Sequence, residues 1–239
     1  MDAQVYIGFD SRERLAWQVC AASMQARASA PVSISQIGRI DLERRGLYTR
    51  RQHDEAGVQW DDVSAAPVST DFALARFWVP QLAGRSGWAL YCDCDFLWRG
   101  DVRALFALAE PRYAVQVVKH DHAPTESVKM ERQVQTSYPR KNWSSLMLFN
   151  LSHAGAQRLQ PGDLNGLPGR DLHAFCWLKG EEIGELPIEW NWLDGYSDPA
   201  IDAAAAHLTR GTPDMPGWEW TRYAREWNQY AQAFMTRAA

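Results

Sequence analysis

Residues 88–95 read WALYCDCD, an apolar run that ends in two aspartates. Its first five residues form a continuous apolar run, which is typical of a central strand that is buried on both faces of a sheet. Two carboxylates, Asp93 and Asp95, follow directly. Because ligands of α/β proteins bind at the carboxyl ends of the strands, we expect these two residues to lie at a ligand site.

Extended and helical patterns alternate along the rest of the chain. We expect strands near residues 4–9, 32–40, 113–118, 143–149 and 183–186, and helices near 15–26, 70–82, 152–159, 171–178 and 221–237. This alternation predicts an α/β fold with a mostly parallel central sheet flanked by helices. The polar, basic stretch 43–51 is expected to be an exposed loop.

Length and composition are those of one globular domain. The chain has 239 residues, of which 46% are hydrophobic and 23% charged, and its formal net charge is −4. A single core suffices at this length, so we expect one domain over residues 1–239. The negative charge argues against a protein that coats nucleic acid.

The sequence predicts a cytoplasmic protein. The first residues show no signal-peptide pattern, and no apolar run reaches the roughly 18 residues of a membrane span, so no transmembrane segment is expected. The four cysteines do not form a dense framework, which favours reduced thiols. A metal site at Cys92 and Cys94 is a weaker alternative, since no other cysteine pair lies near in sequence.

The carboxylates of Asp93 and Asp95 are expected to repel each other, and a cation between them would remove this repulsion. If the extended geometry persists, Asp93 and Asp95 leave the same face of the strand. Two carboxylates roughly 5 Å apart repel by about 3 kcal/mol at an effective dielectric constant near 20. Mn²⁺ or Mg²⁺ between them would keep coordination positions for phosphate oxygens. The plainer alternative is that one aspartate caps the next helix and the other faces water.

Longer blocks carry a family resemblance. The string YCDCDFLWRGDV at 91–102 resembles the "Y-x-D-x-D-x-x-x-x-G-D-[LV]" block of family 8, glycogenin-like glycosyltransferases. Four other segments resemble blocks of this family in the same order: VYIGFD at 5–10, NWSSLMLFN at 142–150, LPIEWN at 186–191 and AHLTRG at 206–211. The resemblance covers roughly residues 4–220.

The resemblance implies a GT-A fold and transfer of a hexose from a nucleotide-diphosphate sugar, here a UDP-hexose, to a hydroxyl acceptor such as a cell-surface glycan. It implies Mn²⁺ or Mg²⁺ held by Asp93, Asp95 and His207. It also implies a donor-nucleotide half near residues 1–100, an acceptor half near 101–220 and a C-terminal helix at 221–239. Peripheral membrane contact stays open. The candidate donor-binding residues are Phe9, Asp10, Arg76, Lys119, Lys141, Asn142, Ser144, Ser145, Arg210 and Gly211.

Three departures from the family pattern affect the site. The family's "D-Q-D" falls on Asp171-Leu172-His173, which leaves Asp171 and His173 as candidate catalytic residues that orient donor or acceptor; neither is assigned as a nucleophile. The stereochemistry of transfer therefore stays open. The family's Lys-Pro-Trp is absent after His207, which leaves Arg210 as a substitute phosphate cation. Bulky Trp143 stands where the family has a small residue.

Two other functions use the same residue types. A Mg²⁺-dependent phosphotransferase would use Asp93 as its nucleophile, although the bulky segment 96–98 is a poor match for such enzymes. A non-catalytic protein that binds a nucleotide sugar or carbohydrate would need the fold without the chemistry, and the weakened 171–173 segment motivates this alternative.

Overall fold

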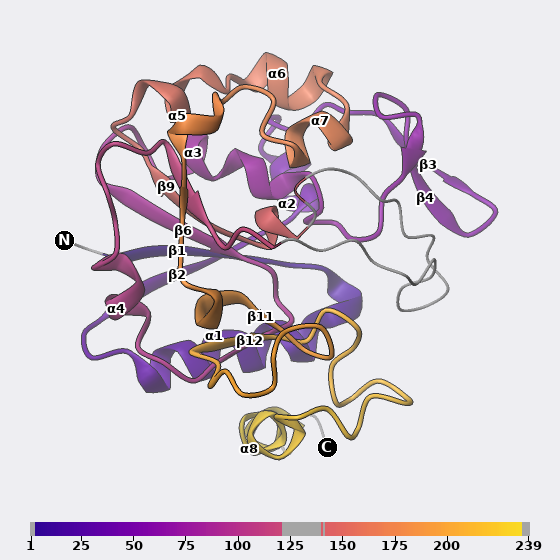
Figure 1. Ribbon diagram of the computed structural model, residues 1–239. Coiled ribbons are helices and arrows are strands. Elements are labelled where there is room, and N and C mark those ends of the chain that lie inside the picture. The colour runs from indigo at the N-terminus through magenta and orange to yellow at the C-terminus, as the bar shows by residue number, and fades with distance from the viewer. Residues whose placement is uncertain (1–2, 121–139, 141, 236–239) are drawn as a thin grey trace.

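A six-stranded mixed sheet forms the centre of the protein in the computed structural model, which describes residues 3–120, 140 and 142–235 (Figure 1). Its strands are β1 (Ala3–Gly8), β2 (Val32–Ile37), β6 (Trp88–Cys92), β8 (Val115–Val117), β9 (Leu146–Asn150) and β10 (Ile183–Glu185). Their order across the sheet is β10-β8-β9-β6-β1-β2. Strand β9 pairs antiparallel with β6 and β8, and the other pairs are parallel, so the mostly parallel sheet is confirmed.

Helices cover both faces of this sheet (Figure 1). On one face lies α1 (Arg14–Arg27), with α8 (Ala224–Met235) packed outside it. Helices α3 (Val79–Leu82), α5 (Ala154–Arg158), α6 (Pro161–Gly166) and α7 (Gly169–His173) lie on the other face, as the figure shows. The remaining helices are α2 (Arg39–Arg44), α4 (Val102–Phe106) and the 3-10 segments η1 (Ser11–Glu13), η2 (Ala75–Trp78), η4 (Trp143–Ser145), η5 (Gly180–Glu182) and η6 (Ile188–Asn191).

Two small sheets complete the fold. Strands β3 (Gln52–Glu55), β4 (Val58–Asp61) and β5 (Ala66–Pro67) form an antiparallel sheet at one edge of the molecule. Strands β7 (Phe96–Trp98), β11 (Trp192–Leu193) and β12 (Ala205–His207) form the other. In this sheet β12 runs antiparallel to β7, with His207 opposite Phe96. This pairing places β12, from late in the chain, close to the end of β6.

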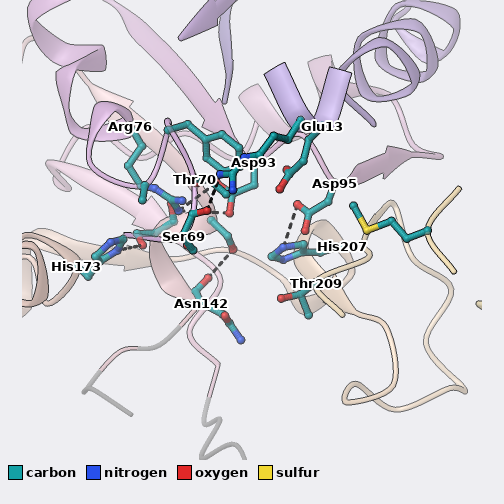
Figure 2. A pocket seen from close by; sticks show the side chains of 16 residues that line it. Glu13, Ser69, Thr70, Arg76, Asp93, Asp95, Asn142, His173, His207 and Thr209 are labelled. Atoms are coloured by element: carbon teal, nitrogen blue, oxygen red, sulfur yellow. Dashed lines mark hydrogen bonds and ion pairs between the residues drawn. The ribbon is translucent and has the colours of Figure 1, made fainter. Parts of the chain in front are cut away.

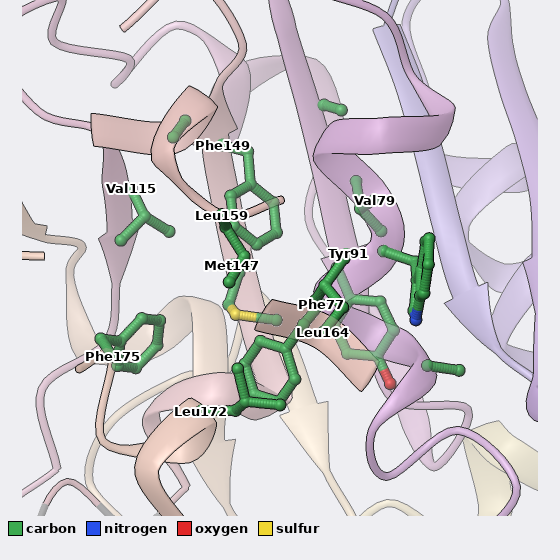
Figure 3. Packing of buried hydrophobic residues seen from close by; sticks show 14 of the residues in the cluster. Phe77, Val79, Tyr91, Val115, Met147, Phe149, Leu159, Leu164, Leu172 and Phe175 are labelled. Carbon is green, nitrogen blue, oxygen red and sulfur yellow. The ribbon is translucent and has the colours of Figure 1, made fainter. Parts of the chain in front are cut away.

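The core holds the end of β6 in place. On one face of the sheet Phe77, Tyr91, Met147, Phe149 and Leu172 pack together, each at most 1% exposed (Figure 3). A second cluster fills the space between the sheet and α1. All five residues of β6 are buried, as expected for a central strand. The carboxylates that follow it therefore start from a rigid support.

One expectation about local structure is wrong, and another holds in part. Residues 70–82 do not form one helix, because turns at 71–74 are followed by η2 and then by α3, which accommodates Pro80 in its first turn. The stretch 43–51 is mostly exposed and has no helix or strand after Arg44, as expected, but the Arg50 side chain is fully buried against Asp61. None of the described helices combines the length and apolarity that a membrane crossing requires.

Candidate active site

The two aspartates lie where the chain leaves the central sheet. The backbone N–H of Asp93 donates to the carbonyl of Ser145 at 2.9 Å, which ties this point to β9. The chain then turns at Cys94 and Asp95 before β7 begins, so the extended geometry assumed from the sequence does not persist. The carboxylates nevertheless converge. One ligand atom each from Asp93, Asp95 and His207 lies within 4.8 Å of the others (Figure 2).

His207 reaches this group through backbone pairing. It is the last residue of β12, and the N–H of the next residue, Leu208, donates to the carbonyl of Asp95 at 2.9 Å. The imidazole stacks on Phe96, with ring centroids 4.4 Å apart and planes at 17°. Its Nε2 atom lies 3.2 Å from Oδ1 of Asp95. The ring is thus aimed at the carboxylates by the sheet and by one aromatic neighbour.

The three side chains suit a divalent cation. Carboxylate oxygens and an imidazole nitrogen are ligands that Mn²⁺ accepts. Burial raises the pKa of Asp93, repulsion from Asp95 raises it further, and the neighbouring Arg76 and His207 oppose the shift. Negative charge gathered in this way is unfavourable without a cation. The donor set and the spacing therefore fit the metal site expected from the sequence.

Arg76 lies beside the first aspartate, on the side of the site opposite Asp95 (Figure 2). Its Nη1 atom is 3.1 Å from Oδ1 of Asp93 and donates to the carbonyl of Ser144 at 2.9 Å. The hydroxyl of Tyr91 donates to the same carboxylate at 2.6 Å. The guanidinium also lies over the Tyr91 ring, 5.2 Å from its centre. Asp93 is consequently oriented by two donors while its residue still lines the cavity.

A third carboxylate, Glu13, faces the same cavity and was missed by sequence reasoning. It ends η1, directly before α1, and accepts a hydrogen bond from the thiol of Cys94 at 3.0 Å. Burial raises its pKa to about 7, against an opposing effect of the Cys94 hydrogen bond, and Asp95 adds to the increase. Its position after the carboxyl end of β1 is the signal that could have identified it.

The opposite wall comes from η4 and α7. Of the predicted donor-binding residues, Asn142, Ser144 and Ser145 line the cavity, as does the candidate catalytic His173. The Ser144 hydroxyl and His173 Nδ1 are 2.7 Å apart. Asn142 enters this wall with a φ of 64°, a left-handed conformation that asparagine tolerates better than most residues. The lining not predicted from the sequence includes Arg12, Ser69, Thr70, Phe72, Ala73, Thr209 and Met215.

Other predicted residues lie outside the cavity lining and contact other protein groups. Asp10 is 1% exposed and accepts from the Arg12 side chain and from the Asp71 N–H. Phe9 packs edge-on against Trp17. The side chain of the candidate catalytic residue Asp171 pairs with Arg170 at 3.5 Å.

Of the predicted cations, Arg76 lines the cavity, whereas Arg210 and Lys119 do not. Arg210 pairs with Asp194 at 2.8 Å and lies over the Trp218 ring. Gly211 packs so closely on Trp218 that a Cβ atom there would lie 2.2 Å from the indole. The Lys119 ammonium is 5.9 Å from the centre of the Trp143 ring, and neither residue lines the cavity. Lys141 lies outside the described residues.

The cavity as a whole is short of positive charge for an anionic ligand. Its lining contains the carboxylates of Glu13, Asp93 and Asp95, against the guanidinium groups of Arg76 and Arg12. The Arg12 guanidinium is engaged by Asp10 at 2.6 Å. A diphosphate would therefore be repelled unless a divalent cation entered with it.

One curated protein gives a clear sequence match. Protein CDI of Arabidopsis thaliana is 40% identical to this chain over 229 residues, which cover 94% of this chain and 84% of that protein. No protein-family model matches the chain.

Solved glycosyltransferase structures share the fold. The bifunctional glycosyltransferase WbbM gives a TM-score of 0.57 at 14% identity over 96% of this chain. GlyE of Streptococcus pneumoniae TIGR4 gives 0.58 at 15% identity over 97%, and the galactosyltransferase LgtC, solved with donor and acceptor sugar analogs, gives 0.56 at 14% over 96%. The chain spans 51% of the WbbM chain, 60% of GlyE and 95% of LgtC. The GT-A glycosyltransferase fold expected from the sequence is confirmed.

Proposed function

This chain belongs to the same family as Protein CDI of Arabidopsis thaliana, and we propose that it is a metal-dependent glycosyltransferase that moves a hexose from a nucleotide-diphosphate sugar to a hydroxyl acceptor. The observation that carries this proposal is the convergence of Asp93, Asp95 and His207 within 4.8 Å at one cavity. The cavity lies at the carboxyl ends of β1 and β6, where α/β proteins bind their ligands.

The charge balance of the cavity supports metal dependence. Its carboxylates would repel the donor's diphosphate, and Asp93, Asp95 and His207 would hold the Mn²⁺ or Mg²⁺ that reverses this repulsion. When bound, the cation supplies positive charge where negative charge develops on the leaving nucleotide diphosphate. Arg76 keeps the Asp93 carboxylate oriented toward this position and adds a fixed positive charge beside it.

His173 is the candidate catalytic residue that can touch substrate, since it lines the cavity and Asp171 does not. Its contact with Ser144 and its edge-on packing against Phe77, 5.1 Å between ring centres, fix the imidazole at the end of the cavity away from Glu13 (Figure 2). There it would hydrogen-bond the transferred sugar or the incoming hydroxyl. Asp171 would act at most through the orientation of α7.

The blocks at 91–102 and 142–150 further support assignment to the glycogenin-like family 8 and a UDP-hexose donor. The acceptor is a sugar or other hydroxyl, with a cell-surface glycan as the first class to test.

A thermal-shift screen of nucleotide sugars with and without Mn²⁺ tests this function. A ligand at 100 times its dissociation constant stabilises the folded state by about 2.7 kcal/mol. We expect UDP-glucose or UDP-galactose to raise the melting temperature strongly only when Mn²⁺ is present. The best donor is then assayed for release of UDP with a panel of hydroxyl acceptors.

Two outcomes would favour the other functions. Binding of the nucleotide sugar without hydrolysis or transfer over a broad acceptor panel would indicate a non-catalytic binding protein. A phospho-aspartate trapped at Asp93 would indicate a phosphotransferase. Wild-type rates of metal-dependent transfer in both Asp93→Asn and Asp95→Asn would reject the proposed metal ligands.

A further inference from the structure

A buried amide stands behind the candidate metal ligands. Asn191, at the end of η6, is 0% exposed. Its Oδ1 atom lies 3.0 Å from Nδ1 of His207. Its Nδ2 atom lies 2.9 Å from Oγ of Ser145 and 3.3 Å from the carbonyl oxygen of Asn142. One side chain therefore links β12 to the η4 wall of the cavity.

Counting donors and acceptors leaves one arrangement of this network. The Asn142 carbonyl can only accept, and the Ser145 hydroxyl uses its single proton to donate to it at 2.7 Å. Both neighbours of Nδ2 are therefore acceptors, which identifies this atom as the amide nitrogen and its partner as the carbonyl oxygen. Since Oδ1 of Asn191 can only accept, Nδ1 of His207 must carry a proton.

The proton on Nδ1 determines which nitrogen of the His207 ring can bind a cation. A neutral ring with a proton on Nδ1 has its lone pair on Nε2, and Nε2 is the atom that faces Asp95 at 3.2 Å. Stacking on Phe96 prevents the ring from turning away. Metal-binding histidines are held in this way by a partner on the second nitrogen.

We infer that Asn191 is a positioning residue, which holds His207 as the Nδ1–H tautomer and presents Nε2 to a divalent cation. This inference rests on the proposed metal site. The same amide also holds the Asn142 carbonyl, whose residue lines the cavity. Asn191 thereby couples the metal ligand to the wall opposite it.

Nitrogen NMR of the metal-free protein tests the tautomer directly. Long-range couplings in 15N-labelled protein report which ring nitrogen carries the proton, and loss of one imidazole signal set in His207→Gln assigns it. We expect a protonated Nδ1 and an unprotonated Nε2 in the neutral ring of the wild type. In Asn191→Ala the proton should shift at least partly to Nε2. A neutral wild-type ring with its proton on Nε2, or an unchanged ring in the variant, would overturn the inference.

Binding of Mn²⁺ alone, followed by electron paramagnetic resonance, tests the consequence. Partners of metal ligands contribute roughly 10- to 100-fold to metal affinity, so Asn191→Ala should weaken Mn²⁺ binding by about that factor. Asn191→Asp keeps an acceptor for Nδ1–H and should bind Mn²⁺ more tightly than Asn191→Ala does. Because Asn191→Asp keeps this hydrogen bond, it still tests the inference if Asn191→Ala fails to fold.

Asn150 offers a matched control. It is buried, at 6% exposed, lies at the opposite end of β9 and donates to the carbonyls of Pro111 and Tyr113. Asn150→Ala should lower stability without changing Mn²⁺ affinity. Equal Mn²⁺ affinities in Asn191→Ala and Asn150→Ala, or no Mn²⁺ binding by the wild type, would contradict the inference. Neither readout requires sugar transfer, so a failure of the proposed activity is distinguished from a failure of this assignment.

Discussion

Nε2 of His207 lies 3.2 Å from Oδ1 of Asp95, and backbone pairing brings these two residues together. Strand β12 places His207 opposite Phe96, and the Leu208 N–H donates to the Asp95 carbonyl. The two side chains are therefore held together whether or not they attract each other. Substitutions at either position should change cation binding more than they change the fold.

Asp95→Asn separates these effects. Removal of one carboxylate relieves repulsion by Asp93 and Glu13, so the metal-free variant should be at least as stable as the wild type. Its Mn²⁺ affinity should fall by about 100-fold or more, beyond the loss expected for a residue that only supports a ligand. Urea denaturation and Mn²⁺ titration measure the two quantities. A destabilised variant with unchanged Mn²⁺ affinity would contradict the assignment.

Arg76→Met should make stability depend on the cation. Arg76 and Asp93 are both largely buried, and removal of one partner of such a pair typically costs about 3–5 kcal/mol. Mn²⁺ can replace the lost positive charge, so it should restore more stability to the variant than it adds to the wild type. Unfolding in urea with and without Mn²⁺ tests this. An identical Mn²⁺ effect in both proteins would speak against a shared position for the two charges.

We expect the stability of the metal-free protein to depend on pH through Glu13. Its pKa rises from 4.5 to about 7 in the folded state, chiefly through burial. Between these values the folded protein keeps a proton that the unfolded chain releases, so stability falls as pH rises through this window. The slope is about 1.4 kcal/mol per pH unit. Glu13→Gln should remove this slope from the metal-free protein.

Free energies of unfolding from about pH 5 to pH 8 provide the measurement for Glu13. The exposed Glu181 serves as a control, because Glu181→Gln should keep the wild-type slope. Equal slopes in Glu13→Gln and the wild type would mean that Glu13 is not buried beside the aspartates.

Removal of the buried Arg50 side chain should lower stability without affecting the candidate metal site. Its side chain and that of Asp61 are 0% exposed and 2.6 Å apart, and it also donates to the carbonyls of Leu164 and Leu167. Arg50→Met should lower the free energy of unfolding by about 3–5 kcal/mol and leave Mn²⁺ affinity unchanged. Arg51, 85% exposed and paired with Asp62, is the matched control, with an expected loss below about 1 kcal/mol. Similar losses in both variants would refute the burial argument.

The parts of the molecule that sequence reasoning captures are governed by local pattern. The apolar run of β6 specifies a buried strand, and the charged pair at its end indicates the candidate site, because both follow from residue type and spacing. His207 is identified mainly through the family resemblance, since its approach to Asp95 depends on the pairing of β7 with β12.

The sequence does not show which protein groups engage the candidate residues in the folded chain. Asp10 and Arg210 have the right chemistry for a nucleotide, but Arg12 and Asp194 engage them. Glu13 reads as an ordinary surface glutamate until α1 packs beside Cys94. Arg50 lies in a basic stretch that is typical of a loop, and its burial depends on Asp61 from β4. Each case is decided by contacts that periodicity does not encode.

A crystal structure of the protein with Mn²⁺ and UDP would show whether Asp93, Asp95 and His207 hold a cation beside a diphosphate. We expect anomalous density for manganese in contact with carboxylate oxygens of Asp93 and Asp95 and with Nε2 of His207, with the diphosphate of UDP beside it. UDP bound with no manganese at these three side chains, or manganese bound elsewhere on the protein, would contradict it.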